Sequence, residues 1–210
     1  MKKTAPISVD VVRCGWASSG DELYARYHDD EWGVPKADSR ALFEKMVLEG
    51  FQSGLSWITI LRKRENFRRA FAEFDPERIA RFGAKDFARL MADEGIVRNR
   101  LKIEATIDNA KAYLKLSERI SFAAFLWGFF PDGPIVNIRE TLKDIPGSTD
   151  LSKSISKALK AEGFRFVGPT TIYAFMQSVG MVNDHVADCH RHGACEKLQR
   201  TFKRPGAKAS

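Results

Sequence analysis

Apolar side chains recur at three- and four-residue intervals along most of the chain, which is the period of an amphipathic helix. The clearest stretch opens at Asp38 or Ser39, both favourable N-cap residues, and runs to about Lys63 across a break rich in glycine and serine. Its apolar stripe consists of Leu42, Phe43, Met46, Val47, Gly50, Trp57, Ile58 and Leu61. Glu49 lies one heptad after Leu42, at the edge of that stripe, where a lone carboxylate costs free energy unless it is paired.

The same period, together with cap residues, predicts further helices on both sides of this stretch. Asp21 is placed to cap a short helix, and Asp75 precedes Pro76 at a first helical position, where the missing N–H of proline costs nothing. The predicted helices span residues 21–28, 65–74, 85–92, 98–116, 152–161 and 169–179, and one more starts at residue 76. The aromatic stretch 122–130 is expected in the core, and 131–146 is loop-rich. Alternating strand patterns are few, so the fold class is mainly α.

Length and hydropathy narrow the class of protein. At 210 residues the chain fits one large domain or two small ones, and 44% hydrophobic residues is ordinary for a globular protein. No apolar run approaches the ~18 residues of a membrane span. No apolar segment follows Met1-Lys2-Lys3, as a secretory signal would require. We therefore expect a cytoplasmic protein without a membrane partner.

Charge and cysteine content point to the kind of partner. A formal charge of +7 favours a polyanionic partner, either nucleic acid or an anionic membrane surface. Three cysteines are an odd number in a chain with no export signal. Metal ligation or free thiols are therefore expected rather than a disulfide framework.

Candidate metal ligands gather near both ends of the predicted fold. Cys14 and His28 lie near the N-terminus, and His185 and Cys189 lie near the C-terminus with the spacing of one helical turn. A Cys2His2 set is a closed tetrahedral zinc site of the structural type, and a zinc ion there ties the two terminal regions together. In the alternative reading His28 is a polar helix-end residue and Cys189 a buried thiol. Rival ligands are His190, His192 and Cys195.

A helix-turn-helix is predicted at about residues 152–180, with Gly163 and Gly168 framing a compact turn. Backbone N–H groups at the start of its second helix suit a phosphate oxygen. Nearby basic residues add screened attraction to a phosphate group; they are Lys153, Lys157, Lys160 and Arg165. The alternative is an ordinary helical hairpin with solvated lysines.

A third group of candidate site residues consists of aromatic rings, which we expect around Glu49. The rings are Trp16, Tyr24, Tyr27, Trp32 and Trp57. Core packing is the alternative for each ring, and it is the reading we adopt for Trp32. A ring-lined pocket with one carboxylate suits a flat, electron-poor, cationic ligand, because stacking and cation–π attraction hold the ligand while Glu49 attracts its charge.

Several of these residues stand in motifs that resemble the 3-methyladenine DNA glycosylase I family. The motifs run in one order from about Arg13 to Cys189. They are Cys14-Gly15-Trp16, Tyr27-His28-Asp29-Asp30-Glu31-Trp32-Gly33-Val34-Pro35, Leu48-Glu49, Gly54-Leu55-Ser56-Trp57-Ile58, Gly95-Ile96-Val97-Arg98, Phe164-Arg165-Phe166-Val167-Gly168 and Val182-Asn183-Asp184-His185-Val186.

The resemblance implies a two-lobed helical fold of the helix-hairpin-helix glycosylase superfamily. It also implies hydrolytic removal of 3-methyladenine from alkylated double-stranded DNA, with the free base as product. Zinc is implied at Cys14, His28, His185 and Cys189. We accordingly expect a flexible arm over residues 1–12, a single catalytic unit over 13–200 and a flexible tail over 201–210. We further expect a monomer associated with the bacterial nucleoid.

The departures from the wider superfamily bear on mechanism. Much of the superfamily carries a catalytic Asp where Asn183 stands in this chain, and Asp184 is out of register by one residue. Lyase members carry a lysine just after the hairpin glycine, whereas Pro169-Thr170 follows Gly168 here. No Schiff-base nucleophile is therefore expected, and strand cleavage should not accompany base removal.

We therefore expect a repair glycosylase that flips the damaged nucleotide into the ring-lined pocket. Trp57 and Trp16 would stack on the base, Glu49 would accept hydrogen bonds from it, and Tyr27 would add a polar contact beside Tyr24. Leu55, next to Gly54 on a predicted turn, is the candidate wedge that fills the gap in the base stack. DNA contacts are expected from Lys157, Lys160, Arg165 and Gly168.

Two alternatives from other classes make different predictions. A non-catalytic, zinc-stapled helix-hairpin-helix DNA-binding module should ignore free 3-methyladenine. A metallohydrolase with an open zinc site should lose activity on chelation while the fold survives, whereas a closed Cys2His2 site should lose its fold first.

Overall fold

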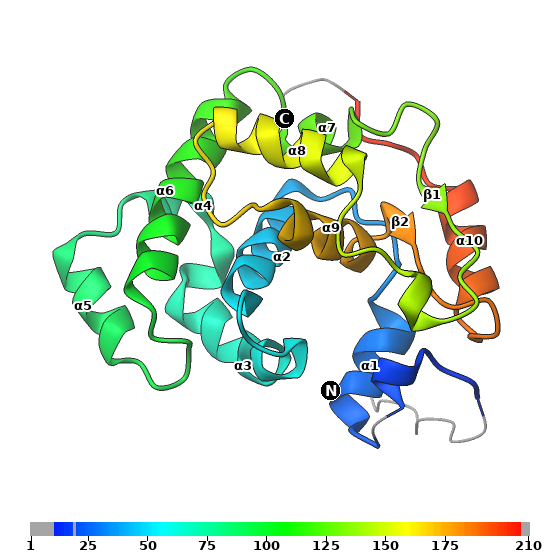
Figure 1. The fold of residues 1–210 in the computed structure, drawn as a ribbon. Coiled ribbons are helices and arrows are strands. Elements are labelled where there is room, and N and C mark those ends of the chain that lie inside the picture. Colours follow the sequence, from blue (N-terminus) through cyan, green and yellow to red (C-terminus); the bar gives the residue numbers. More distant parts are fainter. Residues whose placement is uncertain (1–10, 19, 207–210) are drawn as a thin grey trace.

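A computed structural model describes residues 11–18 and 20–206 of the chain, and these residues form a mainly helical fold (Figure 1). The predicted fold class is confirmed at this level. The helices are α1 (Glu22–Asp30), α2 (Ser39–Gln52), α3 (Trp57–Ala70), α4 (Pro76–Ala80), α5 (Ala84–Ala92), α6 (Arg100–Ser117), α7 (Phe122–Trp127), α8 (Asp150–Ala161), α9 (Pro169–Ser178) and α10 (His192–Arg200). Short 3-10 turns are η1 (Gly15–Ala17), η2 (Ala72–Phe74) and η3 (Leu142–Asp144). Of the predicted arm and tail, residues 1–10 and 207–210 lie outside the described residues. None of the helices in the described part is long and apolar enough to cross a membrane.

Cap residues set most helix starts where the sequence predicts them. The side chain of Asp21 accepts from the Tyr24 N–H at 2.9 Å, and that of Asp38 accepts from the Ala41 N–H at 2.7 Å. Each cap satisfies an N–H group that the first turn of a helix otherwise leaves unpaired. α6 begins two residues later than predicted because Asn99 is its cap.

The boundary predicted near Lys63 is wrong, because α3 is a single helix from Trp57 to Ala70. Between these ends the chain carries a polar run, residues 62–66, which interrupts the apolar period. In the structure the side chains of this run are exposed or half-buried, and they are held by ion pairs such as Arg64 with Glu31 at 2.6 Å. The run therefore interrupts the apolar pattern without ending the helix.

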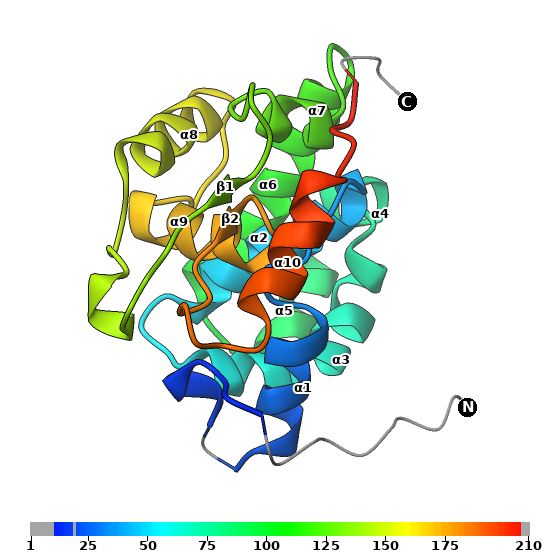
Figure 2. The same ribbon diagram turned by 90° about the vertical axis from the view of Figure 1, so that its right-hand side faces the viewer.

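Three elements, namely β1, β2 and α10, are not predicted by the sequence patterns. β1 (Ile135–Val136) pairs in parallel with β2 (Val182–Asn183), and a two-residue strand is too short to show alternation. α10 follows the ligand-rich segment and lies beside β2 (Figure 2). His185 and Cys189 lie on the connection between them, so the helical turn predicted for this pair is wrong. A hydrogen bond from the Cys189 N–H to the Val186 carbonyl folds that connection instead.

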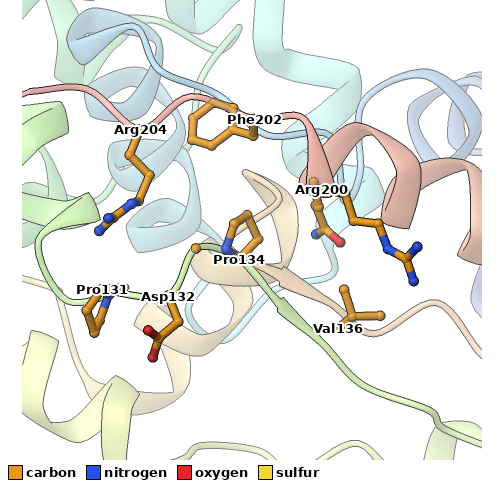
Figure 3. A pocket seen from close by; sticks show the side chains of 9 residues that line it. Pro131, Asp132, Pro134, Val136, Arg200, Phe202 and Arg204 are labelled. Atoms are coloured by element: carbon orange, nitrogen blue, oxygen red, sulfur yellow. The ribbon is translucent and has the colours of Figure 1, made fainter.

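The end of the described chain packs across α7. The Phe202 ring packs at a tilt against the Trp127 ring, with 4.5 Å between centroids, and Arg204 donates to the Phe130 carbonyl at 2.7 Å. Beside this contact lies a cavity of about 440 Å³ (Figure 3). The residues that line the cavity are Pro131, Asp132, Gly133, Pro134, Val136, Gln199, Arg200, Phe202 and Arg204. None of them is a candidate site residue.

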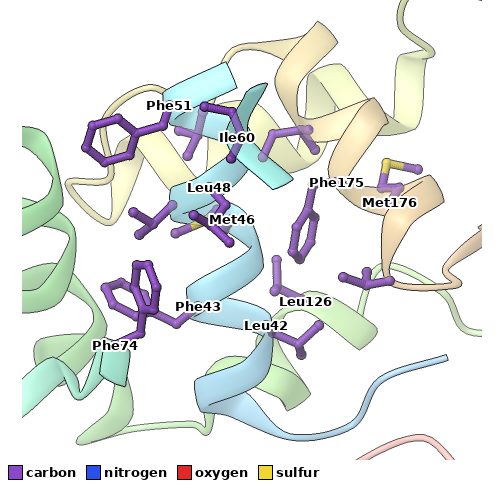
Figure 4. Packing of buried hydrophobic residues seen from close by; sticks show 14 of the residues in the cluster. Leu42, Phe43, Met46, Leu48, Phe51, Ile60, Phe74, Leu126, Phe175 and Met176 are labelled. Carbon is purple, nitrogen blue, oxygen red and sulfur yellow. The ribbon is translucent and has the colours of Figure 1, made fainter. Parts of the chain in front are cut away.

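α2 lies at the centre of the molecule and is packed by α3, α7 and α9 (Figure 1). Leu42, Phe43 and Met46 from α2 are almost fully buried, and Phe175 of α9 packs into the same cluster (Figure 4). Each such side chain contributes about 1.5–3 kcal/mol by leaving water. Gly50 lets the helix approach the hairpin turn closely, since a Cβ there would lie 3.3 Å from the Phe166 Cβ. The core thus fixes the α2 residues that carry the candidate site.

The predicted helical hairpin is present, with α8 and α9 packed against each other. Gly163 has φ +94°, a conformation that favours glycine, and the next N–H, of Phe164, returns to the Leu159 carbonyl. The Ser156 hydroxyl donates to the Val167 carbonyl at 2.6 Å. These bonds hold the turn in one conformation and place Gly168 at the N-cap of α9.

Candidate active site and metal centre

The structure brings the predicted rings together on one side of α2. Trp16 lies 4.9 Å from Tyr24 and 6.3 Å from Tyr27, and Tyr27 lies 5.2 Å from Trp57, measured between ring centroids. The Asp21 cap of α1 sets both tyrosines, which lie three residues apart and therefore on the same face. Tyr27 and Trp57 are buried, whereas Trp16 and Tyr24 are half-buried at the opening of this ring cluster.

Glu49 is 5% exposed, and its nearest charged partner is Lys45, one helical turn earlier on α2. The Lys45 ammonium lies 3.3 Å from Glu49 Oε1 and donates to the Tyr27 hydroxyl oxygen at 2.7 Å. The same ammonium lies 3.4 Å from the centroid of the Trp57 ring. Sequence reasoning missed Lys45, because its i,i+4 spacing from Glu49 is also that of an exposed ion pair on a helix surface.

Burial and this contact act in opposite directions on the carboxylate. The pKa of Glu49 lies above its usual value, because burial raises it by more than the charge of Lys45 and the hydrogen bonds from Lys45 and Ser178 lower it. Burial also lowers the pKa of Lys45 to about 8. Burial, reinforced by the charge of Glu49, raises the pKa of Tyr27, so this phenol is neutral at physiological pH. Because Tyr27 accepts from Lys45, its own O–H is still available as a donor.

Trp57 and Trp32 differ in their surroundings. The Trp57 indole N–H is buried and has no hydrogen-bond partner within the described residues. Trp32 is 8% exposed and packs at 4.5 Å from the His185 ring and 6.2 Å from the His28 ring. The packing role expected for Trp32 is what the structure shows.

Four buried side chains meet at the candidate metal centre. The Cys14 Sγ lies 3.6 Å from the His185 Nδ1, and the Cys189 Sγ lies 3.5 Å from the same nitrogen and 3.4 Å from the His28 Nε2. Zinc–sulfur and zinc–nitrogen bonds of about 2.3 and 2.05 Å at tetrahedral angles put S and N about 3.6 Å apart. The four side chains therefore fit one tetrahedral zinc ion.

The outer contacts of these ligands also suit a metal. The Nδ1 of His28 lies 2.8 Å from Asp29, which Arg13 binds in turn, and the Nε2 of His185 lies 3.2 Å from the Trp32 carbonyl. Such partners orient the imidazole rings and fix the nitrogen that faces the ion. Hydrogen bonds from Cys14, His185 and His28 lower the pKa of Cys189, so this thiol favours the anionic form that zinc requires.

The rival ligands point elsewhere. His190 bonds Asp29 at 3.0 Å, and the Nε2 of His192 lies 2.8 Å from the Asn137 carbonyl. Cys195 is buried against Trp32, with its sulfur 3.8 Å from the Trp32 carbonyl. The group of four that can hold one ion therefore does not include them.

Leu55 lies at the tip of the short loop between α2 and α3, and it is 42% exposed. The preceding Gly54 has φ +81°, so the turn favours glycine. Lys102 of α6 donates to the Phe51 carbonyl at 2.8 Å and to the Ser53 carbonyl at 2.6 Å. A cation at the C-terminus of α2 stabilises these carbonyls and anchors the loop that presents Leu55.

The hairpin presents its candidate phosphate contacts at the surface. Lys157 and Lys160 are exposed on α8, and the side chain of Arg165 is 41% exposed while it pairs with Asp108 at 2.6 Å. Gly168 leads into α9, whose first turn continues with Pro169 and the exposed Thr170.

Asn183 and Asp184 have structural partners. Asn183 is fully buried, donates to the His192 carbonyl at 3.0 Å and accepts from the His185 N–H at 3.2 Å. Asp184 is also fully buried, and its two oxygens accept from Tyr173, Gln177, Asn137 and Arg139. Both side chains thus join β2 to its neighbours, and Glu49 is the buried carboxylate beside the ring cluster.

Comparison with known proteins places this arrangement in a family. The sequence model of the methyladenine glycosylase family matches residues 16–192. DNA-3-methyladenine glycosylase 1 of Escherichia coli (strain K12) is 53% identical over 178 residues, which cover 84% of this chain and 95% of that protein.

Solved structures agree with this assignment. A crystal structure of 3-methyladenine DNA glycosylase I superposes with a TM-score of 0.84 at 51% identity, covering 86% of this chain and 100% of that one. A variant of 3-methyladenine DNA glycosylase I in complex with 3-methyladenine superposes with a TM-score of 0.82 at 38% identity, covering 86% and 97%. The chain belongs to the methyladenine glycosylase family.

Proposed function

We propose that this protein excises N3-alkylated adenine, with 3-methyladenine as the main substrate, from alkylated double-stranded DNA by hydrolysis. The observation that carries the proposal is a buried carboxylate, Glu49, beside a cluster of aromatic rings in a member of the methyladenine glycosylase family. An adenine alkylated at N3 carries a positive charge in DNA and leaves as a neutral base. A site that combines a carboxylate with π-faces prefers the charged base to ordinary adenine.

Each pocket residue has a role that follows from its placement. The flipped base stacks on Trp57 and Trp16 and meets Glu49, which accepts hydrogen bonds from its amino group or ring edge. Tyr27 donates its free O–H, and the half-buried Tyr24 lines the wall. Because the alkylated base is a good leaving group, the pocket need not protonate it.

The proposed DNA contacts come from the loop between α2 and α3 and from the helical hairpin. Leu55 enters the base stack in place of the flipped nucleotide, as apolar wedges do in kinked DNA. The α9 N-terminus at Gly168 offers backbone N–H groups to a phosphate, and Lys157, Lys160 and Arg165 supply screened attraction. In this proposal the catalytic unit spans residues 13–200 and comprises two helical lobes.

We infer that the enzyme has no lyase step. Pro169 and Thr170 follow the hairpin glycine, so no amine is present where a Schiff-base nucleophile would stand. Asp184 is engaged by four donors, which removes it as a base. Released base without strand breaks is the expected outcome.

A structural zinc ion at Cys14, His28, His185 and Cys189 completes the proposal. When bound, the ion supplies a closed cross-link and no open coordination position. Cys14 and His185 stand 171 residues apart, so the ion links η1 and α1, which carry three of the pocket rings, to the segment after β2. Binding free energy at such a site adds to folding stability.

The test is release of base from methylated duplex DNA, with the base identified by chromatography and strand breaks measured in parallel. Glu49→Gln should fold and lose excision, because the amide removes the negative charge that the cationic base requires. Glu44→Gln is the matched control on α2, since Glu44 pairs with Arg68 at 2.8 Å. Wild-type rates in Glu49→Gln, or a wild-type adduct trapped by borohydride, would contradict the proposal.

A further inference from the structure

Lys45 is a buried ammonium inside the candidate active site, and the mechanism above gives it no role. It is 8% exposed, and its nitrogen makes three contacts that converge on the base-binding groups. These are the Glu49 carboxylate at 3.3 Å, the Tyr27 hydroxyl at 2.7 Å and the Trp57 ring face at 3.4 Å. A single side chain therefore touches the three pocket residues that are almost fully buried.

A lysine in such a place costs free energy, so its placement requires a physical reason. Removing an ammonium from water is expensive unless a partner compensates it. A cation on the face of Trp57 also competes for the attraction that a cationic base would use. Packing alone would be served better by an apolar side chain of similar length, such as methionine.

The other acidic groups around Lys45 are already paired with arginines. The titratable and charged groups that face it are Tyr27 and Glu31 of α1, Lys36 of the preceding loop, Glu44 and Glu49 of α2, and Arg64 and Arg68 of α3. Glu31 binds Arg64 at 2.6 Å, and Glu44 binds Arg68 at 2.8 Å. Glu49 is thus the anion that has Lys45 as its partner.

We propose that Lys45 is a positioning residue for Glu49: it keeps the buried carboxylate ionised and oriented toward the ring cluster before the base arrives. Without the ammonium, desolvation favours the protonated acid, which is neutral and donates a hydrogen bond where an acceptor is required. With it, the cationic base meets a charged acceptor whose position is already fixed, and binding requires less reorganisation.

Two residues one helical turn apart on α2 therefore have different roles. Glu49 contacts the base, while Lys45 acts through Glu49, Tyr27 and Trp57 and touches no reacting atom. The burial that makes the pocket selective for a cation would otherwise neutralise the carboxylate. The role of Lys45 in excision rests on the proposed function, but its effect on the ionisation of Glu49 does not.

The direct test is a pH titration of the Glu49 side-chain carboxyl by carbon-13 NMR on zinc-loaded protein without DNA. Glu49→Gln identifies the resonance by its loss. In Lys45→Met the titration midpoint should rise by about 1–3 pH units, since an opposite charge at this distance has an effect of that size. Lys36→Met, which removes a lysine from the same small cavity, should leave the midpoint unchanged.

A reciprocal measurement keeps the test decisive if Lys45→Met fails to fold. The Lys45 amine should titrate at lower pH in Glu49→Gln than in the wild type, because the coupling between two sites acts equally on both. An unchanged Glu49 midpoint in Lys45→Met, or an unchanged Lys45 midpoint in Glu49→Gln, would overturn the proposal.

Excision as a function of pH then tests the catalytic consequence. Lys45→Met should lose base release at neutral pH and regain it at higher pH, where Glu49 ionises without help, and Lys45→Arg should retain the wild-type profile. A loss of equal size at every pH would show a packing role only and overturn the proposal. A wild-type protein that releases no base at any pH would instead refute the proposed function, and the NMR result would still stand.

Discussion

Replacing the buried ion pair of Lys45 and Glu49 by uncharged side chains should stabilise the fold while abolishing excision. The perturbation is the double variant Lys45→Met with Glu49→Gln, which keeps the size of both side chains close to the original. Buried ion pairs are often less stable than apolar replacements of similar volume, because desolvation exceeds the attraction between the charges. The pair is therefore expected in the structure for function rather than for stability.

The magnitude follows from the ionisation of Lys45. Burial lowers its pKa from 10.5 to about 8, and one pKa unit corresponds to about 1.4 kcal/mol. The charged lysine therefore costs roughly 3 kcal/mol at pH 7 even with Glu49 beside it. The double variant should gain about 1–4 kcal/mol in free energy of unfolding.

The direction in which the free energy of unfolding changes with pH gives a second check of this prediction. The pKa of Lys45 is lower in the folded state than in the unfolded state, so the unfolded chain binds more protons between about pH 8 and 10.5. This cost is fully present below about pH 8 and is relieved as the pH rises to 10.5. The advantage of the double variant should accordingly shrink over that interval.

Urea unfolding of zinc-saturated wild type, both single variants and the double variant provides the measurement, at pH 7 and near pH 10. Lys45→Met alone should be less stable than the double variant at pH 7, because it leaves Glu49 buried without its partner. A double variant less stable than the wild type at pH 7, or an advantage that does not change with pH, would refute this reasoning.

Three further predictions concern the metal centre and the DNA-facing loop. Asp29→Asn should weaken zinc affinity about 10–100-fold, measured by competition with a chelator, and retain excision when zinc is saturating. Leu55→Ala should slow excision from duplex DNA roughly 5–10-fold, because the wedge contributes about 1 kcal/mol, while binding of free 3-methyladenine is unchanged; Leu198→Ala, at a similarly exposed leucine of α10, is the control. Lys102→Met should lower the free energy of unfolding by about 2–3 kcal/mol in urea, since two carbonyls lose a charged donor. Wild-type values in any of these measurements would contradict the corresponding assignment.

Local chemistry explains why most helices were predictable. Asp21, Asp38 and Asp75 each precede a helical period, and each accepts from backbone N–H groups of the helix it caps. The polar run inside α3 conceals its continuity, because ion pairs such as Arg64 with Glu31 satisfy polar side chains without ending a helix. Pairing between β1 and β2 depends on segments 47 residues apart, as the register of Ile135 with Val182 shows, and no local pattern encodes it.

The four predicted metal ligands meet in the structure, but the helical turn expected between His185 and Cys189 is not present. The spacing of His185 and Cys189 predicts one helical turn, but a turn closed by the hydrogen bond from the Cys189 N–H to the Val186 carbonyl brings the two side chains together. Their convergence with Cys14 and His28 depends on how β2 and α1 pack, which spacing alone does not determine. The contacts of the two histidines with Asp29 and with the Trp32 carbonyl also depend on packing. A backbone carbonyl in particular can belong to any residue type, so sequence does not point to it.

The burial of Lys45 is the feature of the site that the sequence predicts least well. A lysine four residues before a glutamate predicts an exposed ion pair on a helix surface, and such pairs contribute little to stability. The difference lies in the neighbouring positions, because Leu42, Met46 and Glu49 place this face of α2 in the core. An i,i+4 pair inside an apolar stripe is therefore expensive, and the expense is itself an indication of function. The same pattern of charges thus supports opposite conclusions, and burial, which only the packed helices determine, decides between them.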